Sequence, residues 1–211
     1  MAEADVVGCE TLIAREPDYV DLRNDAASLY LELGQPQRAL PHFAAVSRLQ
    51  PRSAVARYNV GVALEAAGRT AEAAREYEAA IERDPAYSVA HNNLGSLRLA
   101  EGRLDEALSL FARAVALGPA NAEAQNNLGA VLVAGGDAAA AIVHLEQAVR
   151  LRPTYPEAHF NLARAYASAN RLEDAVRTAT TADAQAIAAG KRELSARILE
   201  QLRLYRQRLR E

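Results

Sequence analysis

Residues 88–121 read SVAHNNLGSLRLAEGRLDEALSLFARAVALGPAN, and close variants of this 34-residue stretch recur along the chain. Prolines recur at this spacing, at Pro17, Pro51, Pro85, Pro119 and Pro153. Glycines do the same at Gly34, Gly68, Gly102 and Gly136, with Asn170 in the fifth place. So do the alanines Ala39, Ala73, Ala107, Ala141 and Ala175. Because no insertion or deletion breaks these registers, the sequence predicts repeats of one supersecondary unit.

Each register has a physical cause. Proline disfavours helix in the residue before it, so the prolines mark connections between units. The glycines that follow apolar-periodic runs, such as Gly68, stand where a helix end requires a positive φ. A glycine inside a helix costs about 1 kcal/mol relative to alanine. Glycine nevertheless recurs inside the first helix of three units, which indicates that a neighbouring helix approaches closely at Gly61, Gly95 and Gly129. Large side chains are expected to fill the space between helices at Phe43, Tyr77 and Phe111.

The unit at 88–121 resembles the tetratricopeptide repeat, because its leucine, small, aromatic and proline positions match that motif at Leu94, Gly95, Ala107, Phe111 and Pro119. The resemblance implies an all-α, right-handed solenoid of antiparallel helix pairs, forming a single domain over residues 1–211. We expect five full repeats, at 20–53, 54–87, 88–121, 122–155 and 156–189. A half-repeat helix at 5–16 and a capping helix at 191–209 complete the prediction.

The two ends of the array differ. The helix at 5–16 matches only the second half of a unit, so it is either a natural N-terminal cap or the mark of a cut from a longer array. Ile187 replaces the repeat proline, so the last repeat helix can continue to about Ala189. The final helix has one apolar stripe, and we expect it to solvate the end of the array, although a basic amphipathic helix can also touch a membrane or a partner. The stripe consists of Leu194, Ile198, Leu202, Tyr205 and Leu209.

Composition excludes several classes of function. The 211 residues are 50% hydrophobic and carry a net charge of −3, which gives a packed core but no nucleic-acid footprint. No apolar run approaches the length of a membrane span, and no secretory signal is visible, so a soluble, cytoplasmic protein is favoured. The single cysteine, Cys9, excludes an internal disulfide and is expected to be a small buried residue.

An asparagine register indicates where a ligand would bind. It comprises Asn59, Asn93, Asn127 and Asn161, with Asp25 in the first unit. A carboxamide can meet both the C=O and the N–H of a peptide bond, and the helix spacing matches about every third residue of an extended peptide. The register resembles the asparagine ladder of O-linked N-acetylglucosamine transferases, which implies peptide binding by the backbone. Asparagine at this place can instead support helix packing. Further groove candidates are Tyr58, Asn92, Asn126 and Arg164.

No pattern predicts catalysis, a cofactor or a metal site. His91 and His159 share a register, but neither has a second ligand at a chelating spacing. Arg98 stands where other repeats have Tyr or Leu, and we expect its charged end to snorkel to water; the alternative is that it contributes to a binding surface.

The sequence therefore predicts a non-catalytic scaffold that binds an extended peptide or a partner protein in a concave groove lined by the first helices of the repeats. Two alternatives remain: a substrate-recognition region of a larger enzyme such as a glycosyltransferase, and a self-assembling scaffold. For the latter, weak self-association is expected through the N-terminal end.

Overall fold

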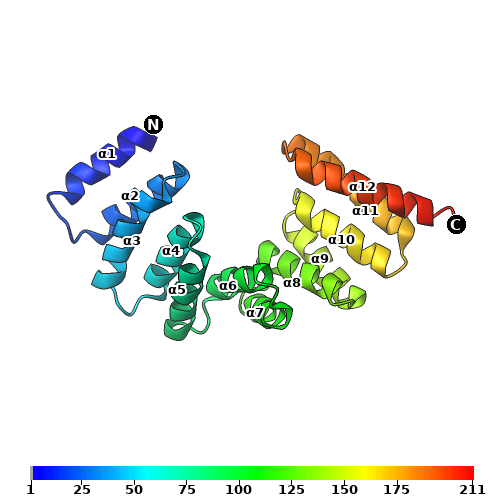
Figure 1. Ribbon diagram of the computed structural model, residues 1–211, viewed down its shortest axis with the longest axis horizontal. Helices are drawn as coiled ribbons and strands as arrows, with labels where there is room; N and C mark the ends of the chain where they lie inside the picture. Colours follow the sequence, from blue (N-terminus) through cyan, green and yellow to red (C-terminus); the bar gives the residue numbers. More distant parts are fainter. Residues whose placement is uncertain (1) are drawn as a thin grey trace. The chain divides into compact units, whose positions relative to one another are not determined.

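The structure is a computed structural model that describes residues 2–211, with side chains from residue 5 onward. The described residues form twelve α-helices (Figure 1). Those of the first half are α1 Ala2–Ile13, α2 Val20–Glu32, α3 Pro36–Leu49, α4 Ala54–Ala66, α5 Thr70–Arg83 and α6 Ser88–Ala100. Those of the second half are α7 Leu104–Leu117, α8 Ala122–Ala134, α9 Ala138–Leu151, α10 Pro156–Ser168, α11 Leu172–Ala188 and α12 Arg192–Arg208. The prediction of an all-α repeat protein is confirmed.

The chain divides into two compact units, one ending at Leu97 and the other spanning Arg98–Glu211. In the first unit α2 packs on α3 and α4 packs on α5. In the second, α8 packs on α9, α10 on α11, and α12 on α11. We call the first helix of each pair helix A and the second helix B. By register, α1 begins like a B helix and α12 follows as an A-type helix.

The terminal helices differ slightly from the prediction. The half-repeat helix, expected at 5–16, spans Ala2–Ile13, because the chain turns at residues 14–18 ahead of and around Pro17. The last helix ends at Arg208, and the apolar stripe of α12 is shorter than predicted. Ile198, Leu202 and Tyr205 are buried, whereas Leu209 is 46% exposed. Helix α11 continues to Ala188, as the absence of the repeat proline predicts.

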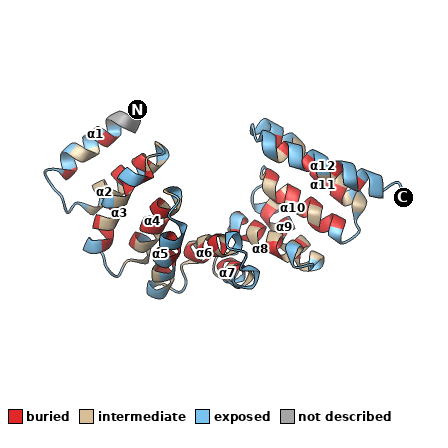
Figure 2. Ribbon diagram, in the orientation of Figure 1, coloured by how far each residue is buried: buried red, intermediate tan, exposed pale blue. Residues whose placement is uncertain are grey.

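The two helices of a pair meet at their eighth residues. A Cβ added to Gly61 would lie 2.5 Å from Cε1 of Tyr77, and one added to Gly129 would lie 2.4 Å from Cγ of Leu145. Tyr77 and Leu145 are fully buried, and Figure 2 shows that buried residues gather along one side of most helices. The small residue on helix A therefore makes room for the large residue on helix B.

The repeat glycines end the A helices in the left-handed conformation. φ lies between 68° and 86° at Gly34, Gly68, Gly102 and Gly136, and Asn170 takes the same role at 58°. The residue after each cap donates its amide to a carbonyl of the last helical turn, as Arg69 N does to Leu64 O. The predicted C-terminal caps are thus confirmed.

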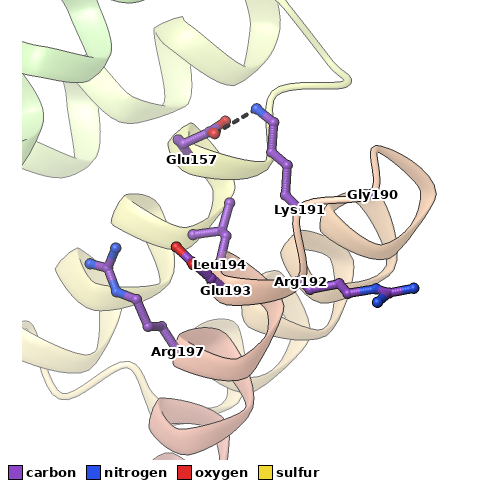
Figure 3. Close-up of a pocket in the computed structure, with 7 residues that line it drawn as sticks. All are labelled: Glu157, Gly190, Lys191, Arg192, Glu193, Leu194 and Arg197. Atoms are coloured by element: carbon purple, nitrogen blue, oxygen red, sulfur yellow. Dashed lines mark hydrogen bonds and ion pairs between the residues drawn. The ribbon is translucent and has the colours of Figure 1, made fainter.

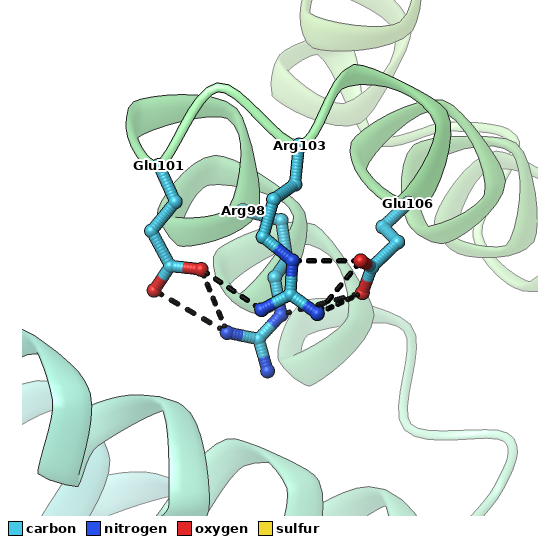
Figure 4. A network of polar contacts seen from close by, with 4 residues as sticks. All are labelled: Arg98, Glu101, Arg103 and Glu106. Atoms are coloured by element: carbon cyan, nitrogen blue, oxygen red, sulfur yellow. Dashed lines mark hydrogen bonds and ion pairs between the residues drawn. The ribbon is translucent and has the colours of Figure 1, made fainter.

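An ion pair recurs at the turn that follows these caps. Arg69, Arg103 and Arg171 each bind the acid three residues later. Arg98 joins the network of the third repeat (Figure 4): its Nη1 lies 3.1 Å from Oε2 of Glu101, and its Nε lies 3.8 Å from Oε2 of Glu106. Only 12% of the Arg98 side chain is exposed. The sequence predicted that this charged end would reach water, and the structure pairs it instead with Glu101 and Glu106, whose side chains are 40% and 50% exposed.

Substitution of Gly61 by alanine is expected to destabilise the fold. The new methyl group overlaps the Tyr77 ring, and overpacking of this kind costs about 1–3 kcal/mol. Gly8→Ala is the matched control, because Gly8 is helical and nothing lies within 4 Å of its added Cβ. That control should keep or raise stability, by up to about 1 kcal/mol. Urea denaturation of both variants measures the difference, and equal stabilities would contradict the close contact.

We expect the ion pairs at these turns to make the fold less stable in acid. Hydrogen bonds from Arg103 and then Arg98 lower the pKa of Glu101. A lowered folded-state pKa contributes stability above the ordinary carboxylate range, and that contribution disappears as pH falls through the folded-state value. Glu101→Gln should therefore flatten the dependence of the melting temperature on pH between neutrality and pH ~3. Glu200→Gln, which removes an exposed acid from α12, should leave the pH dependence of the melting temperature unchanged. Identical pH dependence in both variants would refute a stabilising role for the Glu101 ion pair.

Candidate functional site

The asparagine register occupies the sixth residue of the A helices. All four members, on α4, α6, α8 and α10, are partly exposed and so can reach a ligand: Asn59, Asn93, Asn127 and Asn161. Asp25 holds the same position on α2 and is exposed. Each compact unit contains two of these asparagines.

In the first unit, Asn93 is tied to its neighbours. Its Nδ2 donates to the hydroxyl of Tyr58 at 3.2 Å and lies 3.4 Å from that of Tyr77. Its Oδ1 accepts a long hydrogen bond from Asn92, at 3.4 Å. These contacts join the A helices of consecutive repeats, so Asn93 has a structural role whatever it does for a ligand.

Asn59 differs from Asn93. Within the part of the chain that the structure describes, its carboxamide makes no hydrogen bond. The residue 35 positions earlier, which corresponds to the Tyr58 partner of Asn93, is Asn24. The Oδ1 of Asn24 is buried and has no donor there. The polar groups of Asn24 and Asn59 are therefore the part of the register whose hydrogen-bonding capacity is unused.

In the second unit the same 35-residue relation recurs. Nδ2 of Asn161 donates to Oδ1 of Asn126 at 2.9 Å, and Nδ2 of Asn126 donates to Oδ1 of Asn127 at 3.3 Å. Arg164 then donates to Oδ1 of Asn161 at 3.2 Å. The structure thus brings four predicted site residues together in one polar chain.

The neighbouring fifth-position residues are less accessible. Asn92 and Asn126 are only 2% and 5% exposed, so they orient their neighbours and present little surface. Tyr58 is half-buried between two aromatic rings, with centroids 5.5 Å from Tyr77 and 5.3 Å from Tyr87. Burial, and then the hydrogen bond to Glu65, raise the pKa of Tyr77 far above its ordinary value. Its hydroxyl therefore remains a neutral donor, 2.6 Å from Oε2 of Glu65.

A second polar register, at the fourth residue of the A helices, escaped the sequence analysis. Here a side-chain N–H reaches the carbonyl of the repeat proline six residues earlier. His91 reaches Pro85 O at 3.1 Å, and Gln125 and His159 make the same contact at 3.0 Å. Because a carbonyl can only accept, Nε2 of each histidine carries the proton. The shared register of His91 and His159 is visible in the sequence. Gln125 occupies the same position in the repeat between them, so the common feature is a side-chain N–H and not one residue type.

An open hollow of about 570 Å³ lies at the start of α12 (Figure 3). Nζ of Lys191 lies 2.6 Å from Oε1 of Glu157 and so ties the start of α12 to the first turn of α10. Arg197 approaches the ring of Phe160, with its guanidinium carbon 5.7 Å from the centroid. These contacts hold the terminal helix in place.

The described residues contain no cluster of three potential metal ligands. None of their helices combines the length and the apolarity that a membrane crossing requires. Cys9 is a free thiol and is only partly buried, whereas the sequence predicted a buried residue. Burial, and then Asp25, Asp5 and Glu10, raise the pKa of this thiol.

Similar solved structures share the fold. The MamA protein is 20% identical, with 82% of this chain and 94% of that chain covered and a TM-score of 0.65. YrrB, described as a TPR protein with an unusual peptide-binding site, is 21% identical, with coverages of 87% and 97% and a TM-score of 0.64. PilF of Pseudomonas aeruginosa is 22% identical, with coverages of 91% and 94% and a TM-score of 0.67.

Models of one family account for most of the chain. No curated protein sequence matches it. Three models described as tetratricopeptide repeat match residues 24–88, 86–154 and 132–186. Together these matches extend over residues 24–186, and the chain belongs to the tetratricopeptide repeat family.

Proposed function

We propose that the chain is a non-catalytic interaction scaffold that holds an extended polypeptide against the exposed sides of its A helices. Family membership supports a role in protein interaction, and one structural neighbour, YrrB, is described as having a peptide-binding site. The proposed contact residues are Asn59, Asn93, Asn127 and Asn161, flanked by Tyr58, Asn92, Asn126 and Arg164.

The observation that carries the proposal is the unused polar capacity around Asn59. The partly exposed carboxamide of Asn59 makes no hydrogen bond within the described fold, and a carboxamide can pair with both the C=O and the N–H of a peptide bond. The other three asparagines already make hydrogen bonds within the fold. Each of them can add fewer contacts, and Asn59 therefore contributes most to the affinity.

Charge indicates the composition of the ligand. Asp21 and Asp25 are exposed on α2, the A helix of the repeat that precedes Asn59, and Glu32 ends the same helix. An extended peptide with Lys or Arg on the side that faces α2 would be complementary to these acids.

Asn59→Ala tests the proposal. Peptides are first selected from a library of extended sequences that contain basic residues, and binding is then measured by calorimetry. Loss of one or two backbone hydrogen bonds should weaken binding about 2- to 10-fold. The melting temperature should stay unchanged, because Asn59 makes no hydrogen bond within the described fold. Equal affinity of the wild type and the variant would refute the backbone contact.

Asn93→Ala provides the matched comparison. This variant loses the contacts to Tyr58 and Tyr77, so we expect it to lower stability by about 1 kcal/mol. Methylation of alternate backbone nitrogens of the selected peptide separates backbone from side-chain recognition. If methylation at every position leaves the affinity intact, the chain recognises peptide side chains and not the backbone.

A further inference from the structure

Helix α1 exposes a surface that every other B helix buries. The fourth, eighth and eleventh residues of α3, α5, α7, α9 and α11 are at most 4% exposed. In α1, which starts in the same register, these positions are Asp5, Cys9 and Leu12. Asp5 is exposed, Cys9 is partly exposed, and Leu12 is 49% exposed. Because the eighth residue of a B helix contacts helix A of its own pair, α1 presents the surface on which an A helix would pack.

Helix α12 is an A-type helix, and the flank on which a B helix would pack is exposed. It packs on α11 and α10 through the buried side chains Ser195, Ile198, Leu202 and Tyr205. Its eighth residue, Leu199, is 41% exposed. On the same flank, at helical spacings, lie four exposed arginines whose side chains make no hydrogen bond or ion pair within the described residues: Arg192, Arg203, Arg206 and Arg210. No B helix of the described chain covers this flank.

The two vacant surfaces are complementary in size. In two of the pairs a glycine at the eighth position of helix A faces a large residue at the eighth position of helix B: Gly61 faces Tyr77, and Gly129 faces Leu145. In α12 and α1 the sizes are reversed, because Leu199 is large and Cys9 is small. If α12 of one molecule packed on α1 of another as A packs on B, the combined volume at this contact would be maintained.

The two surfaces are also complementary in charge. Residues 1–34 contain eight acidic and two basic side chains, whereas residues 191–211 contain seven basic and three acidic ones. The paired helices are antiparallel and meet at their eighth residues, so the twelfth residue of helix A lies one turn beyond this contact, opposite the fourth residue of helix B. In α12 the twelfth residue is Arg203, and in α1 the fourth residue is the exposed acid Asp5.

We propose that a second copy of this chain occupies the vacant surface of α1, with α12 of one molecule completing a helix pair with α1 of the next. The contact is head to tail, because it joins different surfaces of the two molecules. It goes beyond peptide binding and involves none of the asparagines. It also differs from the sequence-based expectation, which assigned α12 to capping and placed self-association at the N-terminal end alone.

Charge reversal tests the contact on the full chain. Sedimentation velocity over a series of concentrations should show a mass above that of the monomer, decreasing as salt increases. Arg203→Glu and Asp5→Arg should each raise the dissociation constant by at least about tenfold. A mixture of these two variants should associate again, because the introduced charges are opposite. Arg113→Glu, on an exposed part of α7, should behave like the wild type.

The native thiol provides a second measurement. In Leu199→Cys the introduced thiol would meet Cys9 of a neighbouring molecule, so mild oxidation should give a ladder of disulfide-linked species larger than dimers. Leu204→Cys, with its thiol on the other flank of α12, should give few such species. A monomeric mass at every concentration would overturn the proposal. So would insensitivity to Arg203→Glu together with equal ladders from both cysteine variants.

Discussion

The contact between the eighth residues of paired helices is the constraint on which the rest of the structure depends. It brings α4 and α5 so close that no side chain fits at Gly61, and it does the same for α8 and α9 at Gly129. Helices at this separation align their other positions, including the pair formed by Arg57 and Glu76, with Nη1 3.2 Å from Oε2. The polar registers on helix A keep their places because this contact sets the relative position of the two helices.

The asparagine register serves two functions that compete for the same atoms. A carboxamide has two N–H groups and one oxygen, so each hydrogen bond to a neighbouring repeat reduces what it can offer a ligand. Asn93 and Asn161 use part of this capacity in hydrogen bonds to the residues 35 positions earlier. Asn59 does not. A register that looks uniform in sequence is therefore graded in the structure, and its members should contribute unequally to binding.

The sequence predicted the features that depend on residue type at one position. The glycine contacts, the positive φ of the caps and the continuation of α11 past Ile187 all follow from side-chain size or backbone freedom. It could not predict the polar contacts between repeats, because these depend on which rotamers neighbouring helices allow. Nor could it show that Leu209 is exposed, or that one flank of α12 is uncovered, since both depend on where the helix docks.

The donors to the repeat prolines have a consequence for how the repeats tolerate substitution. His91 and His159 use Nε2–H, and Gln125 uses its amide N–H, to reach the carbonyl of the proline six residues earlier. Two chemically different side chains therefore satisfy the same backbone acceptor, because each carries an N–H at the same distance along the side chain. The position requires a donor of a given reach and not one residue type, so a repeat pattern defined by residue identity does not record it.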